Sequence, residues 1–176
     1  LARPPGGDTA QNGRSGKVPA VVHHPGVSVT YAAITGWGKC MPPAVLTNAD
    51  LATFLDTNDE WITSRTGIKE RRISHVPLSD LAYVSTMRAL ACAGLDPADV
   101  ELIVFGCCSY DDQVPNQASG LQAQLGAKKA ASMDVNTACT SFLYSLSTAA
   151  ALIRTGVVKN AVVVGGEIIT AYMDWK

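Results

Sequence analysis

The sequence is short of charge, and what it lacks argues against several classes of protein. Charged residues make up 16% of the 176 residues and the net charge is -1, so the composition is not that of a nucleic-acid or membrane-surface binder. No apolar run approaches the roughly 18–20 residues that cross a bilayer. We therefore expect neither nucleic acid nor a membrane among the partners.

Cysteine pairs at metal-binding or redox spacing are also lacking. The five cysteines are odd in number and irregularly spaced, with no CxxC pair: Cys40, Cys92, Cys107, Cys108 and Cys139. This pattern argues against a disulfide framework and a zinc site, and it favours a reducing, cytoplasmic setting. Cys107 and Cys108 end an apolar segment, and we expect both to be packing residues.

The beginning of the sequence lacks an initiator methionine and a signal-peptide pattern. Residues 1–28 are rich in Gly, Pro, Ser and Asn, and we expect them to form a flexible extension. Residues 29–176 are expected to form the folded part. Hydrophobic residues make up 47% of the sequence, which is enough apolar material for one domain with a core.

Strand-like and helix-like segments alternate along the folded part. This alternation predicts parallel strand pairing and an α/β layered sheet. We expect Thr47 or Asn48 to cap the first helix, and Ser79 and Gly94 to bound the third. A strand followed by a glycine turn is predicted over 28–38, and a strand or extended arm over 68–74. Further predicted strands cover 100–108, 130–136 and 159–167, and the predicted helices cover 46–55, 57–67, 78–95, 115–127 and 139–153.

Cys139 lies where the strand over 130–136 turns into the next helix. The first N–H groups of a helix and the positive end of its dipole stabilise a thiolate there, and they can also hold the oxyanion of a thioester. A cysteine at such a corner therefore suits acyl transfer. Taken alone, the local pattern is more often that of a buried structural cysteine.

Two stretches of the sequence resemble the beta-ketoacyl-acyl carrier protein synthase III family, condensing enzymes of the thiolase-like superfamily. They read TNADLATFLDTNDEWITSRTGIKERRIS and DVNTACTSFLYSLSTAAALIRTGVVKNAVVVGGE, and the spacing between them also fits. The resemblance covers residues 30–176. It implies that the chain supplies the N-terminal half of a layered α-β-α-β-α sandwich.

The resemblance also implies roles for individual residues. Cys139 would be the nucleophile that accepts the acyl group. Trp61 and Arg65 would hold the adenine end of coenzyme A, with Thr57 nearby, and indole and guanidinium planes do stack on purines. Without the resemblance, the four-residue spacing of Trp61 and Arg65 would indicate ordinary packing with a surface charge.

Two further positions bear on the acyl group. Val114 falls where the family often has a Phe that reaches the acyl pocket of the partner subunit, so we expect room for a longer or bulkier acyl group. After the cysteine the family commonly reads Ala-Gly-Phe, whereas here Thr140 and Ser141 precede Phe142. Ser accepts close backbone approach less well than Gly, which affects the expected primer preference. Keeping Phe142 favours an unchanged nucleophile geometry.

The reaction that the resemblance implies has two steps and needs no cofactor. Cys139 takes an acyl group from acyl-CoA, and malonyl-acyl carrier protein then loses CO₂ and condenses with the acyl-enzyme. The family's catalytic His and Asn belong to its C-terminal half. His23 and His24 lie in the expected extension and His75 follows a predicted strand, so none of the three replaces that His.

Other functions stay open. An acyltransferase of the same family would pass the group on without releasing CO₂. A non-catalytic partner subunit would keep the fold, but such subunits typically lose the cysteine that this chain retains as Cys139. A thiolase or hydroxymethylglutaryl-CoA synthase relative fits less well, because the stretch DTNDEWITSRTG is not expected there.

The helix that begins at Cys139 is apolar or small on every side and has no charged residue before Arg154. A single sheet covers only one side of such a helix, so we expect a second layer over the other. The resemblance implies a complementary C-terminal half, from the rest of a cleaved or split polypeptide, in an assembly that is a homodimer. The alternative is a truncation without independent activity.

Overall fold

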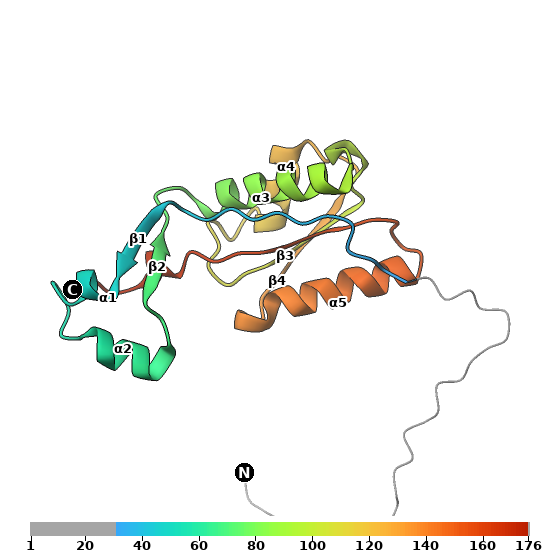
Figure 1. The fold of residues 1–176 in the computed structure, drawn as a ribbon. Coiled ribbons are helices and arrows are strands. Elements are labelled where there is room, and N and C mark those ends of the chain that lie inside the picture. The colour runs from blue at the N-terminus through green and yellow to red at the C-terminus, as the bar shows by residue number, and fades with distance from the viewer. Residues whose placement is uncertain (1–30, 176) are drawn as a thin grey trace, which may run out of the picture.

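The computed structural model describes residues 31–175, so the predicted extension over residues 1–28 lies outside it. Figure 1 shows a sheet flanked by helices, and beside it a smaller unit in which two short helices lie between two antiparallel strands. The sheet and its helices form the larger unit and contain the predicted cysteine corner.

The larger unit is built on a parallel sheet with the strand order β4-β3-β5, which confirms the predicted pairing. Its strands are β3 (Leu102–Gly106), β4 (Ala131–Val135) and β5 (Val162–Gly165). β3 lies in the middle and is buried along its whole length. Its side chains alternate between two clusters, because successive residues of a strand face opposite sides. Ile103 and Phe105 join one cluster, and Leu102 and Val104 join the other.

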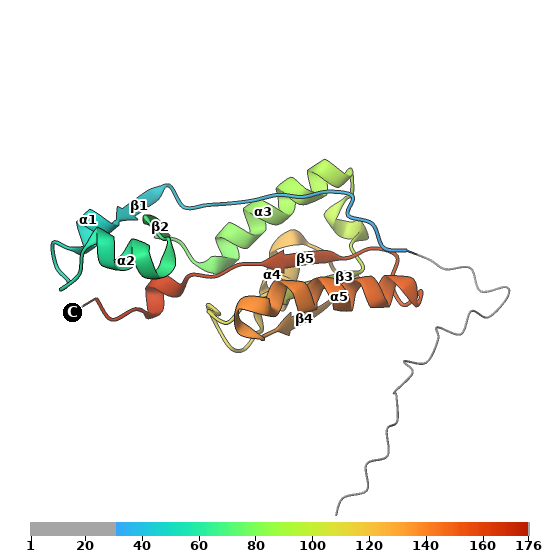
Figure 2. The same cartoon turned by 60° about the horizontal axis from the view of Figure 1, so that its bottom comes forward.

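Helices cover both faces of this sheet. α3 (Leu78–Ala93) and α4 (Gln117–Leu125) lie on one face, and α5 (Ser141–Arg154) lies on the other (Figures 1 and 2). Gly94 ends α3 in the left-handed conformation, as predicted. Short 3₁₀ turns at Pro97–Asp99, Ala138–Thr140 and Ile169–Tyr172 complete the larger unit.

Carboxylates from distant positions cap the two helices on the first face. Asp111 accepts hydrogen bonds from the N–H groups of Leu78 (2.8 Å) and Ser79 (2.7 Å) at the start of α3. The prediction that Ser79 caps α3 is therefore wrong: Pro77 is the N-cap and provides no side-chain hydrogen bond. Asp134 of β4 caps α4 in the same way, through the N–H groups at its first two residues.

The smaller unit pairs β1 (Ala44–Thr47) with β2 (Glu70–Ile73) in antiparallel fashion, and β1 was not among the predicted strands. It also holds α1 (Asn48–Leu51) and α2 (Asp59–Thr66). Thr47 caps α1 in a capping box with Asp50, which settles the choice between Thr47 and Asn48. Asn58 caps α2, and Gly67 ends it with a φ of 72°.

The described part of the predicted strand over 28–38 forms no strand. Residues 31–41 run extended between α3 and β5, and the Lys39 carbonyl accepts a hydrogen bond from the Arg88 guanidinium at 2.6 Å. Gly36 and Gly38 lie against α3 so closely that a Cβ on either would collide with its backbone. This contact with α3 holds the segment away from the sheet, where a strand would find its hydrogen-bonding partners.

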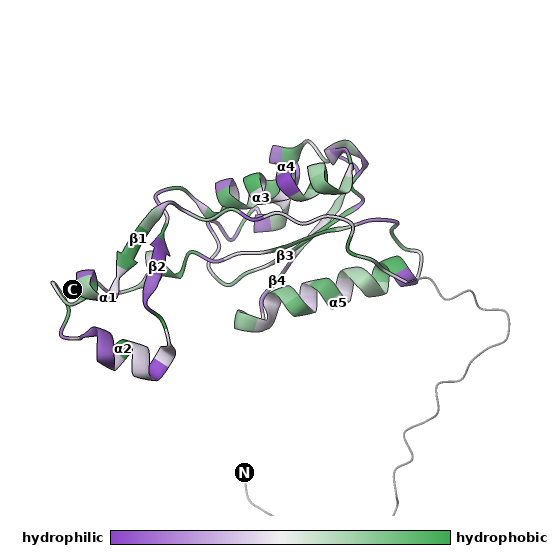
Figure 3. Cartoon of the chain, in the orientation of Figure 1, coloured by the Kyte–Doolittle hydropathy of each residue, from purple (hydrophilic) through white to green (hydrophobic). Residues whose placement is uncertain are grey.

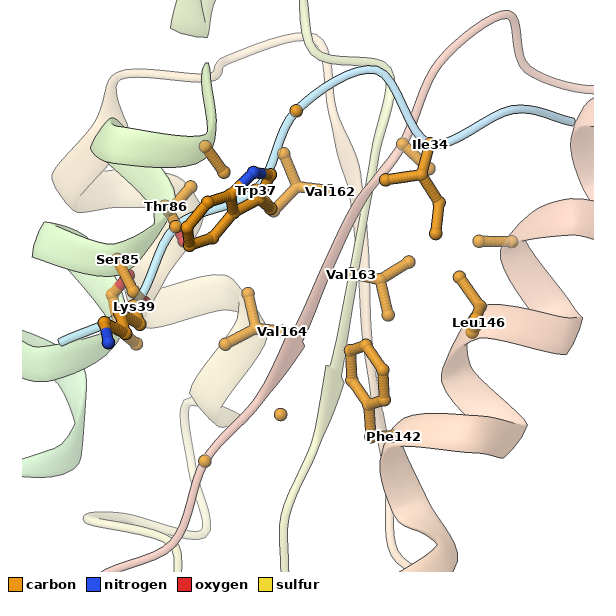
Figure 4. Close-up of a pocket in the computed structure, with 18 of the residues that line it drawn as sticks. Ile34, Trp37, Lys39, Ser85, Thr86, Phe142, Leu146, Val162, Val163 and Val164 are labelled. Carbon is orange, nitrogen blue, oxygen red and sulfur yellow. The ribbon is translucent and has the colours of Figure 1, made fainter. Parts of the chain in front are cut away.

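A cavity of about 710 Å³ separates residues 31–41 from β5, whose outer edge is unpaired within the described residues. Figure 4 shows that side chains of β5 reach it from both faces. Val162 lies towards Trp37 on the α3 side, and Val163 lies towards Phe142 and Leu146 on the α5 side. The gap is therefore apolar on both sides of a free strand edge.

α5 meets the sheet through small side chains. Ser141, Ser145 and Ala149 are its buried residues, spaced four apart on one face. Two of its large side chains point away from the sheet: the exposed fraction is 61% for Leu143 and 58% for Tyr144. The prediction that one sheet covers only one side of this helix is confirmed for residues 31–175.

Candidate active site

The predicted site lies at the edge of the sheet where the strands end. The carboxyl ends of parallel strands meet at one edge, and ligands of α/β folds commonly bind there. Cys108 follows β3, Cys139 follows β4, and Glu167 follows β5. Three loops therefore bring two thiols and a carboxylate to the same edge.

Cys139 lies at a tight corner, as predicted. It is exposed and belongs to the 3₁₀ turn between β4 and α5. Ala138, the residue before it, has a φ of 52°, a left-handed conformation that is uncommon for any residue other than Gly. The chain therefore accepts local strain in order to present Cys139 at the start of α5.

The hydroxyl of Ser141 braces this corner. Ser141 Oγ accepts a hydrogen bond from the Thr137 N–H at 2.9 Å and donates one to the Ala138 carbonyl at 2.7 Å. Its side chain thus takes up space beneath the turn, where the family commonly has Gly, and it links the residues on either side of the strained position. Sequence reasoning noted the substitution but missed this role.

Part of the expected oxyanion-binding capacity is used by the turn itself. The Thr137 N–H donates to Ser141, the Ala138 N–H to the Asn136 side chain at 3.3 Å, and the Thr140 N–H to the Thr137 carbonyl at 3.3 Å. An oxyanion at this corner would need other donors than these three groups.

Glu167 joins the loops that follow β3 and β5. Its carboxylate accepts hydrogen bonds from the N–H groups of Cys108 (2.9 Å) and Ser109 (3.0 Å), and from the Ser109 hydroxyl. Ser109 Oγ in turn accepts the N–H of Ile168 at 2.8 Å. Glu167 was not predicted. The signal that could have revealed it is an acidic residue directly after an apolar strand.

The neighbouring cysteines differ in environment. Cys107 is buried, as expected of a packing residue, and burial, together with nearby carboxylates such as Asp134, raises the pKa of its thiol to about 12. Cys108 is exposed, so the expectation of packing is wrong there: β3 ends before it and the chain leaves the core. Desolvation and then Glu167 raise the pKa of the Cys108 thiol.

The residues proposed for coenzyme A lie together on α2 of the smaller unit. The Arg65 guanidinium stacks on the Trp61 ring, with its carbon 4.4 Å from the ring centroid. Both side chains are exposed. The hydroxyl of Thr57, just before the helix cap, is buried without a hydrogen-bond partner among residues 31–175. Figures 1 and 2 show that α5 begins at the end of the sheet nearer to this unit.

The two positions expected to shape the acyl site occupy different surroundings. Phe142, in the first turn of α5, packs its ring against Gly165 of β5 and reaches the cavity beside that strand. Val114 is 90% exposed in the loop before α4, and a cis peptide bond joins it to Pro115. Its exposure leaves it free to contact another chain, and its effect on the acyl group stays a prediction.

Neither a metal centre nor a membrane span is found among residues 31–175. No group of three or more His, Cys, Asp or Glu residues is placed to hold a metal ion in that range. No helix there has the length and apolar character needed to cross a bilayer. His75 is exposed on the smaller unit, as expected.

Known proteins resemble this chain over most of its described residues. The family model for 3-Oxoacyl-[acyl-carrier-protein (ACP)] synthase III matches residues 133–176, which include Cys139. The chain is 54% identical over 145 residues to Beta-ketoacyl-[acyl-carrier-protein] synthase III 2 of Vibrio cholerae, covering 82% of this chain and 40% of the relative. The corresponding enzyme of Desulfitobacterium hafniense is 46% identical, covering 81% of this chain and 44% of the relative.

Solved structures give the same result. The 3-oxoacyl-[acyl-carrier-protein] synthase III of Aquifex aeolicus superposes with a TM-score of 0.78 at 40% identity, covering 81% of this chain and 47% of that one. The priming beta-ketosynthase of a polyketide pathway superposes with a TM-score of 0.79 at 30% identity, covering 86% of this chain and 47% of that one.

These likenesses define the fold as thiolase-like, with residues 31–175 forming an N-terminal part of it. The chain belongs to the beta-ketoacyl-acyl carrier protein synthase III family, whose N-terminal portion it matches. It spans less than half the length of the curated relatives named above, 40% and 44%.

Proposed function

We propose that the protein is a condensing enzyme that starts fatty-acid or polyketide synthesis, with Cys139 as its acyl-accepting nucleophile. The observation that carries this proposal is the exposed Cys139 at the start of α5, on a strained corner in the region that the family model matches. Its relatives are named as beta-ketoacyl-[acyl-carrier-protein] synthases.

In the first step, Sγ of Cys139 attacks the carbonyl carbon of an acyl-CoA. A new thioester forms on the protein, and coenzyme A leaves as a thiol after taking up the proton that Cys139 gives up. Trp61 and Arg65 hold the adenine end of coenzyme A. Thr57, just before α2 in the chain, has a buried hydroxyl with no hydrogen-bond partner among the described residues. Acyl-CoA is thus a substrate, and no cofactor takes part.

In the second step, malonyl-acyl carrier protein loses CO₂, and the carbanion that remains attacks the Cys139 thioester. The product is a beta-ketoacyl-acyl carrier protein, and the cysteine is released. The His and Asn that promote this step come from a complementary C-terminal half. Val114 would project towards the acyl site of a second copy in a homodimer, consistent with its 90% exposure.

The open edge of β5 supports a complementary half. The cavity of about 710 Å³ lies between that edge and the extended residues 31–41, and it is lined by apolar side chains of α3 and α5. The buried hydroxyl of Thr86 also faces it without a hydrogen-bond partner among the described residues. We propose that the complementary half places a strand here and covers the outer face of α5. The free cysteines favour a cytoplasmic setting for this assembly.

Intact mass spectrometry of the complete protein tests the nucleophile. Incubation with acetyl-CoA or longer acyl-CoAs should add one acyl mass to the wild type and none to Cys139→Ala. Cys108→Ala is the matched control, because its thiol lies at the same edge of the sheet, and it should acylate like the wild type. Acylation of Cys139→Ala at the wild-type level would refute the assignment.

Release of CO₂ separates the proposed condensation from simple acyl transfer. The acylated protein, supplied with malonyl-acyl carrier protein labelled in its free carboxyl group, should release labelled CO₂ in a one-to-one ratio with product. Transfer of the acyl group without CO₂ would show an acyltransferase of the same family instead.

A further inference from the structure

α2 is weakly anchored for a helix that carries a binding site. Ile62 is its only buried residue, while Trp61 is 52% exposed. Figure 3 shows α2 as largely hydrophilic, in contrast to the apolar α5. Apolar contacts therefore do little to fix the orientation of this helix, and polar contacts must fix it instead.

The side chain of Asn48 supplies such contacts from beneath the helix. Asn48 is 2% exposed, although it lies in a unit of mostly exposed residues. Its Nδ2 donates to Asp59 Oδ1 at 2.7 Å, in the first turn of α2. A longer contact of 3.4 Å reaches Thr63 Oγ1, one turn further along. The amide thus follows the inner face of α2 over two turns.

The same amide also binds the chain on the far side of α2. Nδ2 donates to the Ile68 carbonyl at 2.8 Å, and Oδ1 accepts a hydrogen bond from the Arg71 guanidinium of β2 at 2.8 Å. The Asn48 N–H donates to the Lys69 carbonyl at 3.2 Å. One buried residue therefore connects α1, α2 and β2.

The first contact is electrostatically favourable. Asp59 accepts hydrogen bonds from Asn48 and Thr63, and these hold the pKa of its carboxyl below the ordinary value. A carboxylate is a stronger acceptor than a neutral oxygen, so the link between Asn48 and α2 is charge-assisted. Removing the amide would take one donor from Asp59 and one from the Ile68 carbonyl, and it would take one acceptor from the Arg71 guanidinium.

We propose that Asn48 is a positioning residue for coenzyme A, because its amide fixes α2 and thereby the stacked pair Trp61 and Arg65. The residue does not act on the thioester, since it lies beneath the helix and not on the exposed face that carries the stacked pair. The inference rests on the proposed binding of coenzyme A at α2.

Two thioesters separate this role from a general loss of structure. Acetyl-CoA carries the nucleotide that Trp61 and Arg65 would hold, whereas acetyl-pantetheine lacks it. In the complete protein, Asn48→Ala should raise KM for acetyl-CoA by about tenfold and leave kcat within about twofold. KM for acetyl-pantetheine should stay unchanged, because that substrate does not reach α2.

A matched control comes from the same short helix. Asp50 closes the capping box of α1 but does not contact α2, so Asp50→Ala weakens α1 while leaving the Asn48 contacts in place. We expect its KM for acetyl-CoA to equal that of the wild type. Trp61→Ala serves as the positive control and should raise the same KM.

A second variant keeps the test decisive if Asn48→Ala does not fold. Asn48→Asp preserves the shape of the side chain but sets a carboxylate against Asp59, so it should also raise KM for acetyl-CoA by about tenfold or more. Adding Asp59→Asn restores a donor and an acceptor in reversed order. The double variant should therefore recover part of the loss in KM for acetyl-CoA, with KM for acetyl-pantetheine unchanged throughout.

The outcomes are distinguishable. If Trp61→Ala leaves KM for acetyl-CoA unchanged, the proposed coenzyme A site is wrong, and the inference fails with it. If Trp61→Ala raises KM but Asn48→Ala and Asn48→Asp do not, only the role of Asn48 is refuted. A parallel rise in KM for acetyl-pantetheine would also refute it, since the damage would then extend beyond α2.

Discussion

α2 and α5 carry the two parts of the proposed site, and they are held in place by opposite means. α2 buries one apolar residue and is fixed by hydrogen bonds to a single amide, that of Asn48. α5 lies on the sheet through a stripe of Ser and Ala side chains and turns Leu143 and Tyr144 outward. The smaller unit has its polar groups largely satisfied within itself, whereas α5 presents an apolar face that water covers poorly.

This contrast indicates which kind of contact determines the position of each helix. Orientation of α2 depends on directional contacts, so conservative changes to polar residues should affect binding. Placement of α5 depends on close packing over β3 and on whatever covers its outer face, so changes in volume or charge should affect stability and chemistry together. The predictions below test the contrast, beginning with the largest expected effect.

A charge on the outer face of α5 should have the largest effect. In the complete protein, Leu143→Glu is expected to lower the free energy of unfolding by about 3 kcal/mol, because a covering layer would bury an unpaired carboxylate. Urea denaturation measures this change. Glu60→Leu is the reverse change on the exposed face of α2 and should stay within about 0.5 kcal/mol of the wild type. A Leu143→Glu protein of wild-type stability would mean that water covers this face.

A methyl group beneath the start of α5 should have the next largest effect. A Cβ at Gly106 would lie 2.7 Å from the Ser141 carbonyl carbon and 2.9 Å from the Phe142 nitrogen. Gly106→Ala should therefore cost about 2 kcal/mol of stability and, by shifting the corner, slow acylation of Cys139 by about a hundredfold.

Gly120→Ala provides the comparison for that substitution. Its new Cβ would meet nothing within 4 Å, inside α4. We expect it to stabilise the protein by about 0.5–1 kcal/mol, since Ala has the higher helix propensity, and to acylate at the wild-type rate. Equal acylation rates for both variants would show that Gly106 does not set the position of Cys139.

The cap on α3 should have a smaller effect that depends on pH. Burial raises the pKa of Asp111, but hydrogen bonds from the Gln117 side chain and from the N–H groups of Ser79 and Leu78 outweigh it, and the net pKa lies below the ordinary value. This stabilisation is complete above the unfolded-state pKa of about 4 and is lost as pH falls through the lower folded-state pKa.

Asp111→Ala should accordingly cost about 1 kcal/mol at neutral pH, and the difference from the wild type should shrink as pH falls towards 3. Urea denaturation at a series of pH values measures it. A difference that stays constant across this range would show that the carboxylate charge does not stabilise α3.

A smaller effect on acylation than that of Gly106→Ala is expected at Ser141. Ser141→Ala removes the two hydrogen bonds that brace the corner and leaves α5 otherwise intact. We expect acylation of Cys139 to slow by about threefold, with stability lowered by roughly 1 kcal/mol. Stopped-flow measurement of coenzyme A release gives the rate. A Ser141→Ala rate equal to that of the wild type would show that the turn is held without the hydroxyl.

Local sequence signals accounted for most of the fold. The strands β3, β4 and β5, the Thr47 cap of α1 and the glycine that ends α3 all follow from residues within a few positions of each element. The cap of α3 was assigned wrongly because its carboxylate, Asp111, comes from a loop after β3. Residues 28–38 were assigned to a strand and a glycine turn because their composition fits them. The described part of this range forms no strand, because strand pairing needs a neighbouring strand, which composition does not reveal.

For the candidate site, too, the residues with a local sequence signal could be predicted, and those that act through tertiary contacts could not. The corner at Cys139 could be recognised because a strand and a helix meet there, and Trp61 and Arg65 share one helical face. The supporting residues could not be, since Ser141, Glu167 and Asn48 matter only through contacts made after folding. The exposure of Cys108 was also missed, because the chain leaves the core between Cys107 and Cys108, and a sequence pattern does not locate that point to within one residue.

The unpaired edge of β5 has a consequence for handling the protein. Along this edge, the backbone N–H and C=O groups have no paired strand among residues 31–175, so they can pair with an extended polypeptide, and this is how β-rich aggregates grow. Residues 31–175 produced on their own should therefore precipitate more readily as their concentration rises, and Val163→Lys should delay this by placing a charge on the edge strand. Solubility measurements on Val163→Lys and the wild-type sequence would thus show whether the edge of β5 is open before any assay of catalysis.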